Sequence, residues 1–147
     1  DAYDGIKGRQ SSSQGKSELT GESLDQIKAQ AILFIEMQYG KLGYKLNLAG
    51  VENIEGKDAY KLEVTSPNGL KTTEYYDVSS GLKIREMETA TTEAGPMVQI
   101  SDFIEYKEVN GVKFPATVAI SGAMSMKLVA ESITVNQGIK DTEFTID

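Results

Sequence analysis

The chain has 147 residues and a net charge of −7 at pH 7, and it contains no histidine, cysteine or tryptophan. This length suits a single globular domain, and no apolar run approaches the roughly 20 residues needed to span a bilayer. The acidic balance and the scattered basic residues argue against nucleic-acid binding, which requires clustered lysine and arginine. Without histidine or cysteine there is no Ser-His-Asp triad, thiolate nucleophile or histidine zinc site.

Residues 1–22 are polar and rich in glycine and serine. Such a segment buries little surface, so we expect an irregular opening segment with a short extended piece around Ala2–Lys7. The chain begins at Asp1 without a methionine, and we interpret it as a processed or excised part of a longer protein. The absence of cysteine fits a periplasmic protein and a cytosolic one equally.

An amphipathic helix is predicted over residues 23–39. Ser23 and Gln26 form a capping-box pattern, and Gly40 is a plausible left-handed stop. Apolar residues recur at helical spacing on one face, while Leu33 and Met37 project to the opposite side. A helix that is apolar on two sides either packs within the domain or turns its second face toward a ligand or a segment outside this chain.

From residue 44 to residue 147 the hydrophobic period changes to two, which predicts antiparallel strands. Turn signals such as Asn68-Gly69 and Asn110-Gly111 separate them. We expect a single mainly-β (α+β) domain over residues 1–147: a curved up-and-down sheet or half-open β-barrel with a covering helix. The expected strands are residues 44–48, 60–65, 70–78, 82–92, 97–107, 112–120 and 124–135, with 141–147 as a plug or a final short strand.

Carboxylates are the remaining candidates for chemistry. Asp102 shares strand parity with Ile100, Ile104 and Tyr106, so it is either a buried acid with a raised pKa or a residue that a bulge places in water. Glu86 and Glu88 also share a parity, and they either bind a cation or lie at the surface. The acidic side chains of strands 70–78 and 82–92 predict that part of the inward face is wet.

An apolar stripe at Met124, Met126 and Leu128 has two interpretations. Methionine is flexible and polarisable, and it is frequent on surfaces that accept varied apolar ligands. With Leu33 and Met37 the stripe would line a groove between helix and sheet. Plain core packing explains the same residues.

Several segments resemble the outer-membrane lipoprotein carrier family, the Lol-type carriers, in its divergent periplasmic branch. They are GYKLNLAGVENIEGKDAYKLEVTSPNG, TEYYDVSSGLKIRE, FIEYKEVNGVKFPATVAI and DTEFTID, and they follow the predicted helix in this order. The resemblance covers most of residues 20–147, and its specific parts, GKDAYKLEV, YYDVSSGL and NGVKFP, mark hairpins. Family members have further N-terminal strands and a helix before the position of Asp1, so the resemblance implies an N-terminally truncated chain.

The resemblance implies a half-open barrel whose concave apolar face binds acyl chains beneath a helical lid. Leu33 and Met37 would belong to the lid. Strand parity fixes which residues share a face but not which face is concave. The candidates for the concave face are Tyr60, Leu62, Val64, Phe114, Val118, Met124, Met126 and Leu128.

The function expected from this resemblance is a non-catalytic carrier or binding domain for lipid or lipoprotein acyl chains, in the periplasm or bacterial cell envelope, without cofactor or metal. Divergent relatives also resemble C-terminal appendages of insulinase-type zinc peptidases, so an accessory domain that contacts other domains of a longer parent chain is the alternative. A free-standing enzyme that uses carboxylates is a third hypothesis. Missing N-terminal strands would leave an unpaired sheet edge, which favours self-association.

Overall fold

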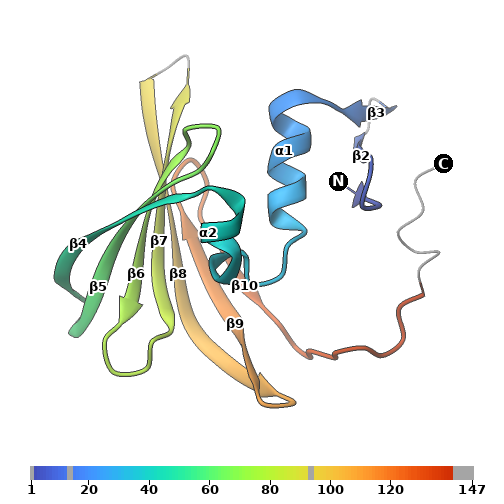
Figure 1. Ribbon diagram of the computed structural model, residues 1–147. Helices are drawn as coiled ribbons and strands as arrows, with labels where there is room; N and C mark the ends of the chain where they lie inside the picture. Colours follow the sequence, from blue (N-terminus) through green and yellow to red (C-terminus); the bar gives the residue numbers. More distant parts are fainter. Residues whose placement is uncertain (1, 13–14, 93–94, 141–147) are drawn as a thin grey trace. The chain divides into compact units, whose positions relative to one another are not determined.

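The computed structural model describes residues 2–12, 15–92 and 95–140 (Figure 1). The chain divides into two compact units, one of residues 1–39 with 136–147 and the other of residues 40–135. None of the helices among the described residues is long and apolar enough to cross a membrane. The predicted last piece, residues 141–147, lies outside the described residues.

The first unit begins with a small antiparallel sheet in the order β1 (Ala2–Tyr3), β2 (Gly8–Ser12), β3 (Gly15–Leu19). The expectation of an irregular opening segment was therefore wrong. Backbone pairing stabilises these polar strands, which have no hydrophobic alternation to reveal them. Helix α1 packs closely on β2, since a Cβ atom at Gly8 would lie 3.1 Å from Leu24 Cδ1 and 3.2 Å from Ile27 Cγ2.

The expected continuous helix over residues 23–39 was also wrong. Helix α1 covers Gly21–Gln30, a 3₁₀ turn η1 covers Ile35–Gln38, and a short α2 covers Tyr39–Leu42. Helix α1 ends at Gln30, and Phe34, between α1 and η1, has a left-handed backbone (φ 53°) that is incompatible with one continuous helix. Thr20 rather than Ser23 occupies the N-cap position, and no side chain caps the helix there.

The second unit contains a seven-stranded antiparallel sheet in the order β10-β9-β8-β7-β6-β5-β4 (Figure 1). Sequential strands are neighbours throughout, which confirms the predicted mainly-β, up-and-down architecture. Among the described residues β4 and β10 each pair on one side only, so the sheet is not a closed barrel. The strands are β4 (Lys45–Ile54), β5 (Lys57–Thr65), β6 (Lys71–Asp77), β7 (Lys83–Thr92), β8 (Gly95–Val109), β9 (Val112–Ser121) and β10 (Met126–Val129).

The predicted glycine turns are present at the predicted positions. Asn110 and Gly111 have φ values of 53° and 80°, as a two-residue hairpin with two left-handed positions requires. Asp77 closes the β6–β7 connection, because its Oδ1 accepts hydrogen bonds from the backbone amides of Ser79 (2.9 Å) and Ser80 (2.7 Å). These turns keep consecutive strands adjacent and give the sheet its simple order.

Strict alternation fails at β-bulges. Two register shifts between β8 and β9, from Phe103 to Tyr106, break the parity that was expected to join Asp102 with Ile104 and Tyr106. A bulge adds one residue to one strand, so side chains beyond it change face relative to a simple count. The last strand is shorter than predicted, since pairing in β10 ends at Val129 rather than at residue 135.

Candidate functional site

One row of cross-strand partners crosses all seven strands of the sheet and defines a single face. From β4 to β10 its members are Leu48, Leu62, Glu74, Glu86, Ser101, Ile120 and Met126. Directly paired side chains lie on the same side of a sheet. Both ends of this row are apolar and its centre is polar. We call this side of the sheet the apolar face.

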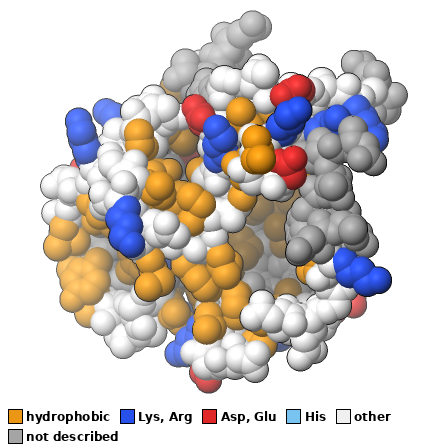
Figure 2. All heavy atoms as spheres, turned by 45° about the vertical axis from the view of Figure 1, so that its right-hand side comes forward, with side chains coloured by type: hydrophobic (Ala, Val, Ile, Leu, Met, Phe, Trp, Pro, Cys, Tyr) orange, Lys and Arg blue, Asp and Glu red, His pale blue; other side chains and the backbone are white. Residues whose placement is uncertain are grey.

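The apolar face has two hydrophobic groups, one at each edge of the sheet. On β4 and β5 the pairs are Leu46–Val64, Leu48–Leu62 and Val51–Tyr60, and on β8 to β10 the group consists of Phe103, Val118, Ile120, Met126 and Leu128. Many of these side chains are exposed: Leu48 is 63% exposed and Leu128 53%. Val64 is already buried. In the space-filling view hydrophobic side chains are broadly exposed, with charged side chains scattered among them (Figure 2).

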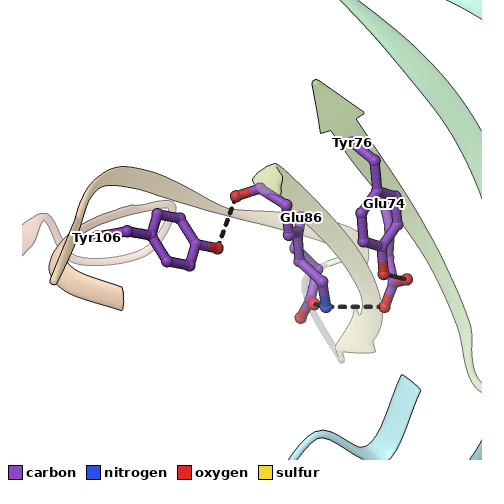
Figure 3. Close-up of polar contacts among 5 residues, drawn as sticks. Glu74, Tyr76, Glu86 and Tyr106 are labelled. Carbon is purple, nitrogen blue, oxygen red and sulfur yellow. Dashed lines mark hydrogen bonds and ion pairs between the residues drawn. The ribbon is translucent and has the colours of Figure 1, made fainter. Parts of the chain in front are cut away.

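The centre of the apolar face carries a polar band, which consists of Glu74, Tyr76, Lys83, Glu86 and Tyr106 (Figure 3). Lys83 Nζ lies 3.0 Å from Glu74 Oε1 and 2.9 Å from Glu86 Oε2. The Tyr76 hydroxyl donates a hydrogen bond to Glu74 Oε2 (2.7 Å), and the Tyr106 hydroxyl donates to the Lys83 carbonyl oxygen (2.8 Å).

Burial makes this polar band energetically important. Glu74 is only 1% exposed, and a carboxylate is tolerated there because Lys83 and Tyr76 satisfy its oxygens. The Lys83 ammonium also lies 5.9 Å from the centroid of the Tyr76 ring and 5.8 Å from that of Phe103. Burial, followed by the negative charge of Glu74, raises the pKa of Tyr44.

Two of the carboxylates proposed from the sequence, Glu86 and Asp102, have partners in the structure. Glu86 accepts a hydrogen bond from Lys83, and Asp102 Oδ1 lies 2.5 Å from Arg85 Nε. Asp102 does line a cavity of about 140 Å³, together with Ile54, Glu55, Lys57, Ile84, Phe103 and Ile104. Its ion pair with the Arg85 guanidinium accounts for this carboxylate structurally. The hydrogen bond from Arg85 to Asp102 also raises the pKa of the arginine.

The predicted ligand-binding residues do not all lie together. Tyr60, Leu62, Val64, Val118, Met126 and Leu128 lie on the apolar face. Met124 precedes β10. Phe114 pairs with Lys107, and two register shifts separate this pair from the pair of Phe103 and Val118. Leu33 and Met37 belong to the first unit, where they are 68% and 84% exposed.

Sequence reasoning missed Leu46, Leu48 and Val51 as members of the apolar face. The alternation of Leu46 and Leu48 was visible, and pairing with Val64 and Leu62 places them on this face. The register shift between Leu48 and Gly50 brings Val51 onto the same face, opposite Tyr60. Among the described residues, no group of three or more acidic, histidine or cysteine side chains is arranged to hold a metal ion.

Comparison with solved structures shows which fold this is. The chain is similar to a DUF1329 family protein from Desulfovibrio piger, with a TM-score of 0.64 and 16% identity over 91% of this chain and 60% of that one. It is also similar to a LolA superfamily protein from Nitrosomonas europaea, with a TM-score of 0.53 and 18% identity over 70% of this chain and 49% of that one. At these identities the likeness shows a shared fold, and the chain spans 60% and 49% of the two solved chains.

No family model matches the sequence, and no curated protein matches it significantly. The likeness to a LolA superfamily structure agrees with the hairpin motifs that resemble the Lol-type carriers.

Proposed function

We propose that the apolar face binds the acyl chains of a lipid or lipoprotein, and that residues 1–147 act as one non-catalytic, carrier-like domain of the bacterial periplasm or cell envelope. The observation that carries this proposal is the exposure of apolar side chains at both ends of a single cross-strand row. Leu48 is 63% exposed at one end and Met126 45% at the other. The fold likeness to a LolA superfamily protein supports the same proposal.

The driving force is the burial of hydrocarbon on both partners. Each buried methylene contributes about 0.8 kcal/mol, so an acyl chain that covers part of this face gains several kcal/mol. Seven strands spaced 4.8 Å apart span about 29 Å, which gives the face the extent for an extended chain. Exposed patches of this kind on a protein surface commonly mark binding sites.

The polar band restricts which ligands suit the face. Glu74, Lys83 and Glu86 lie between the two apolar groups, so a pure hydrocarbon that crossed the whole face would cover charged side chains. Covering them without new hydrogen bonds is unfavourable. An amphiphile whose polar part contacts the band while its acyl chains lie on the apolar groups avoids this cost.

Strand β10 offers a matched pair of substitutions as a test. Leu128 pairs with Val118 on the apolar face, while its neighbour Val129 pairs with Thr117 on the opposite face and is similarly exposed, at 60% against 53%. In a titration with a fluorescent long-chain fatty acid, Leu128→Lys should weaken binding roughly tenfold or more, because one leucine contact contributes 1.5–3 kcal/mol. Val129→Lys should leave binding unchanged.

Native mass spectrometry of the chain, purified without detergent from a bacterial host, provides a second readout. Adducts with lipid masses that are lost in Leu128→Lys and kept in Val129→Lys would support the carrier function. A chain that carries no lipid and binds no fatty acid would contradict it and favour an accessory domain of a longer protein.

A further inference from the structure

Strand β4 is a long sheet edge with exposed side chains. It covers Lys45–Ile54, pairs only with β5 among the described strands, and nine of its ten residues are exposed. Natural edges are usually short, or carry lysine, proline, β-bulges or inward-pointing charges that discourage pairing with an unmatched strand. The opposite edge, β10, has four residues, whereas β4 has no proline and only Lys45 as a basic residue. The feature that needs explanation is therefore β4.

A bulge in β4 restricts which strands can form continuous hydrogen bonds with this edge. The register with β5 shifts between Leu48 and Gly50, where the glycine backbone has φ 133°. A regular strand added at this edge would lose its alignment at the extra residue. A second copy of β4 in antiparallel orientation carries the same extra residue. We propose that two copies of this chain pair through β4 about a two-fold axis between Leu48 and Ala49.

This two-fold register matches the faces of both strands. It places Leu46 opposite Val51 of the second copy and Lys45 opposite Glu52. In the sheet, Leu46 and Val51 pair with Val64 and Tyr60 of β5, which share one face, because they are separated by an even number of residues. By the same reasoning Lys45 and Glu52 lie together on the opposite face. The bulge makes this agreement possible, because residues five apart in an unbulged strand point to opposite sides.

Charge complementarity supports this register. Lysine faces glutamate twice in the two-fold pair, once on each side of the axis, and Asn47 faces Gly50. Opposite charges directly across a sheet are favourable, and like charges are unfavourable. Glu52 already contacts Lys61 at 2.7 Å and remains 46% exposed, so its carboxylate is accessible to a second lysine. The two sheets would join edge to edge, with their apolar faces on the same side of the seam.

The absence of native cysteine allows a direct test of the register by cross-linking. Leu46→Cys and Val51→Cys change exposed residues, so both variants should fold. When the two variants are mixed and oxidised, a disulfide should form between them. Either variant alone should not cross-link, because identical residues lie about 14 Å apart along the strand in this register, the length of the four residues of β5 between the partners of Leu46 and Val51. Equal cross-linking of each variant with itself, or none in the mixture, would overturn the proposal.

A charge substitution tests the same seam without cysteine. In sedimentation equilibrium the native chain should show a concentration-dependent dimer, weak because a single strand pair buries less than a standard interface. Lys45→Glu places glutamate opposite Glu52 twice and should raise the dimer dissociation constant about 3- to 30-fold. Lys113→Glu, an exposed lysine of β9 with the same charge change, should have no such effect. A chain that stays monomeric at millimolar concentration, or equal effects of both substitutions, would overturn the pairing. These measurements are made without lipid, so their outcome is independent of the carrier function.

Discussion

The middle and the edges of the seven-stranded sheet use their side chains in opposite ways. On β6 the charged residues Glu74 and Asp77 are 1% and 7% exposed, whereas on the edge strands Leu48 and Leu128 are 63% and 53% exposed. Glu74 and Asp77 lie on a central strand, and their charges are tolerated at low exposure because an ion pair and hydrogen bonds satisfy them. The buried charges of β6 are held by hydrogen bonds and an ion pair, whereas the outer strands leave apolar side chains in contact with water, and this is the surface proposed for acyl chains.

The largest expected effect comes from removing the cation of the buried pair. Lys83→Met leaves the buried Glu74 carboxylate without the ammonium 3.0 Å away. An uncompensated buried charge typically costs about 3–5 kcal/mol, and we expect a loss of that size in the free energy of unfolding. Urea denaturation at pH 7 measures it.

The double variant Lys83→Met/Glu74→Gln is the control for this prediction. It removes both charges and should recover part of the lost stability, because a neutral amide is far less costly to bury than a lone carboxylate. A loss below 1 kcal/mol in Lys83→Met would show that water reaches Glu74, and the contrast between the middle and edge strands would fail.

The β6–β7 turn gives a pH-dependent effect. Hydrogen bonds from the hydroxyls and backbone amides of Ser79 and Ser80, above all the Ser79 hydroxyl, lower the pKa of Asp77 from its ordinary 3.8 to about 2. Because the folded-state pKa is lower than the unfolded one, this contribution to stability is complete above about pH 4 and is lost as the pH falls toward 2. Asp77→Asn should therefore flatten the stability profile over this range, measured as the urea midpoint against pH. The exposed Glu108→Gln variant should retain the native slope.

A smaller effect is expected on the opposite face. Asp102→Asn weakens the bond to Arg85 and should cost about 1–2 kcal/mol, since both side chains are partly exposed, at 29% and 20%. Glu55→Gln removes the charge of the second partner of Arg85. The Glu55 side chain is 77% exposed, so this substitution should lower the free energy of unfolding by less than about 0.5 kcal/mol. Thermal unfolding of the two variants measures both losses of stability. A larger loss in Glu55→Gln than in Asp102→Asn would contradict the expectation that the more buried ion pair contributes more.

The sequence predicted the hairpins and the strand order because these depend on local backbone preferences. Asn110-Gly111 favours two left-handed residues wherever it occurs, and short connections leave sequential strands adjacent. The left-handed Phe34 has no such signal, because an aromatic residue normally avoids that conformation, so the break between α1 and η1 was missed. The polar strands β1 to β3 lack hydrophobic periodicity and were equally invisible.

The candidate site was only partly predictable for a related reason. Alternation placed Tyr60 and Leu62 on one face, but the membership of Leu48 and Met126 depends on register across all seven strands. Bulges at Gly50 and within β8 reset that register, and they follow from pairing with a neighbour rather than from the strand's own residues. The acidic side chains did predict an interrupted apolar face, yet not that Lys83 would neutralise Glu74.

The smallest expected effect on stability tests the outer strands most directly. Leu48→Thr keeps a residue that favours β-structure and removes an apolar side chain that is already mostly in water, so the free energy of unfolding should change by less than about 0.5 kcal/mol. Val64→Thr, on the neighbouring strand and the same face, introduces a hydroxyl at a position 2% exposed and should cost about 1–3 kcal/mol. Urea denaturation of both variants shows whether exposure, and not residue type, decides the outcome. If Leu48→Thr destabilised the fold as strongly as Val64→Thr, the leucines of β4 would belong to the core, and the surface assigned to acyl chains would lose one of its two apolar groups. If it weakened fatty-acid binding while leaving stability intact, the hydrophobic edge of the sheet would have no explanation in folding and a direct one in binding.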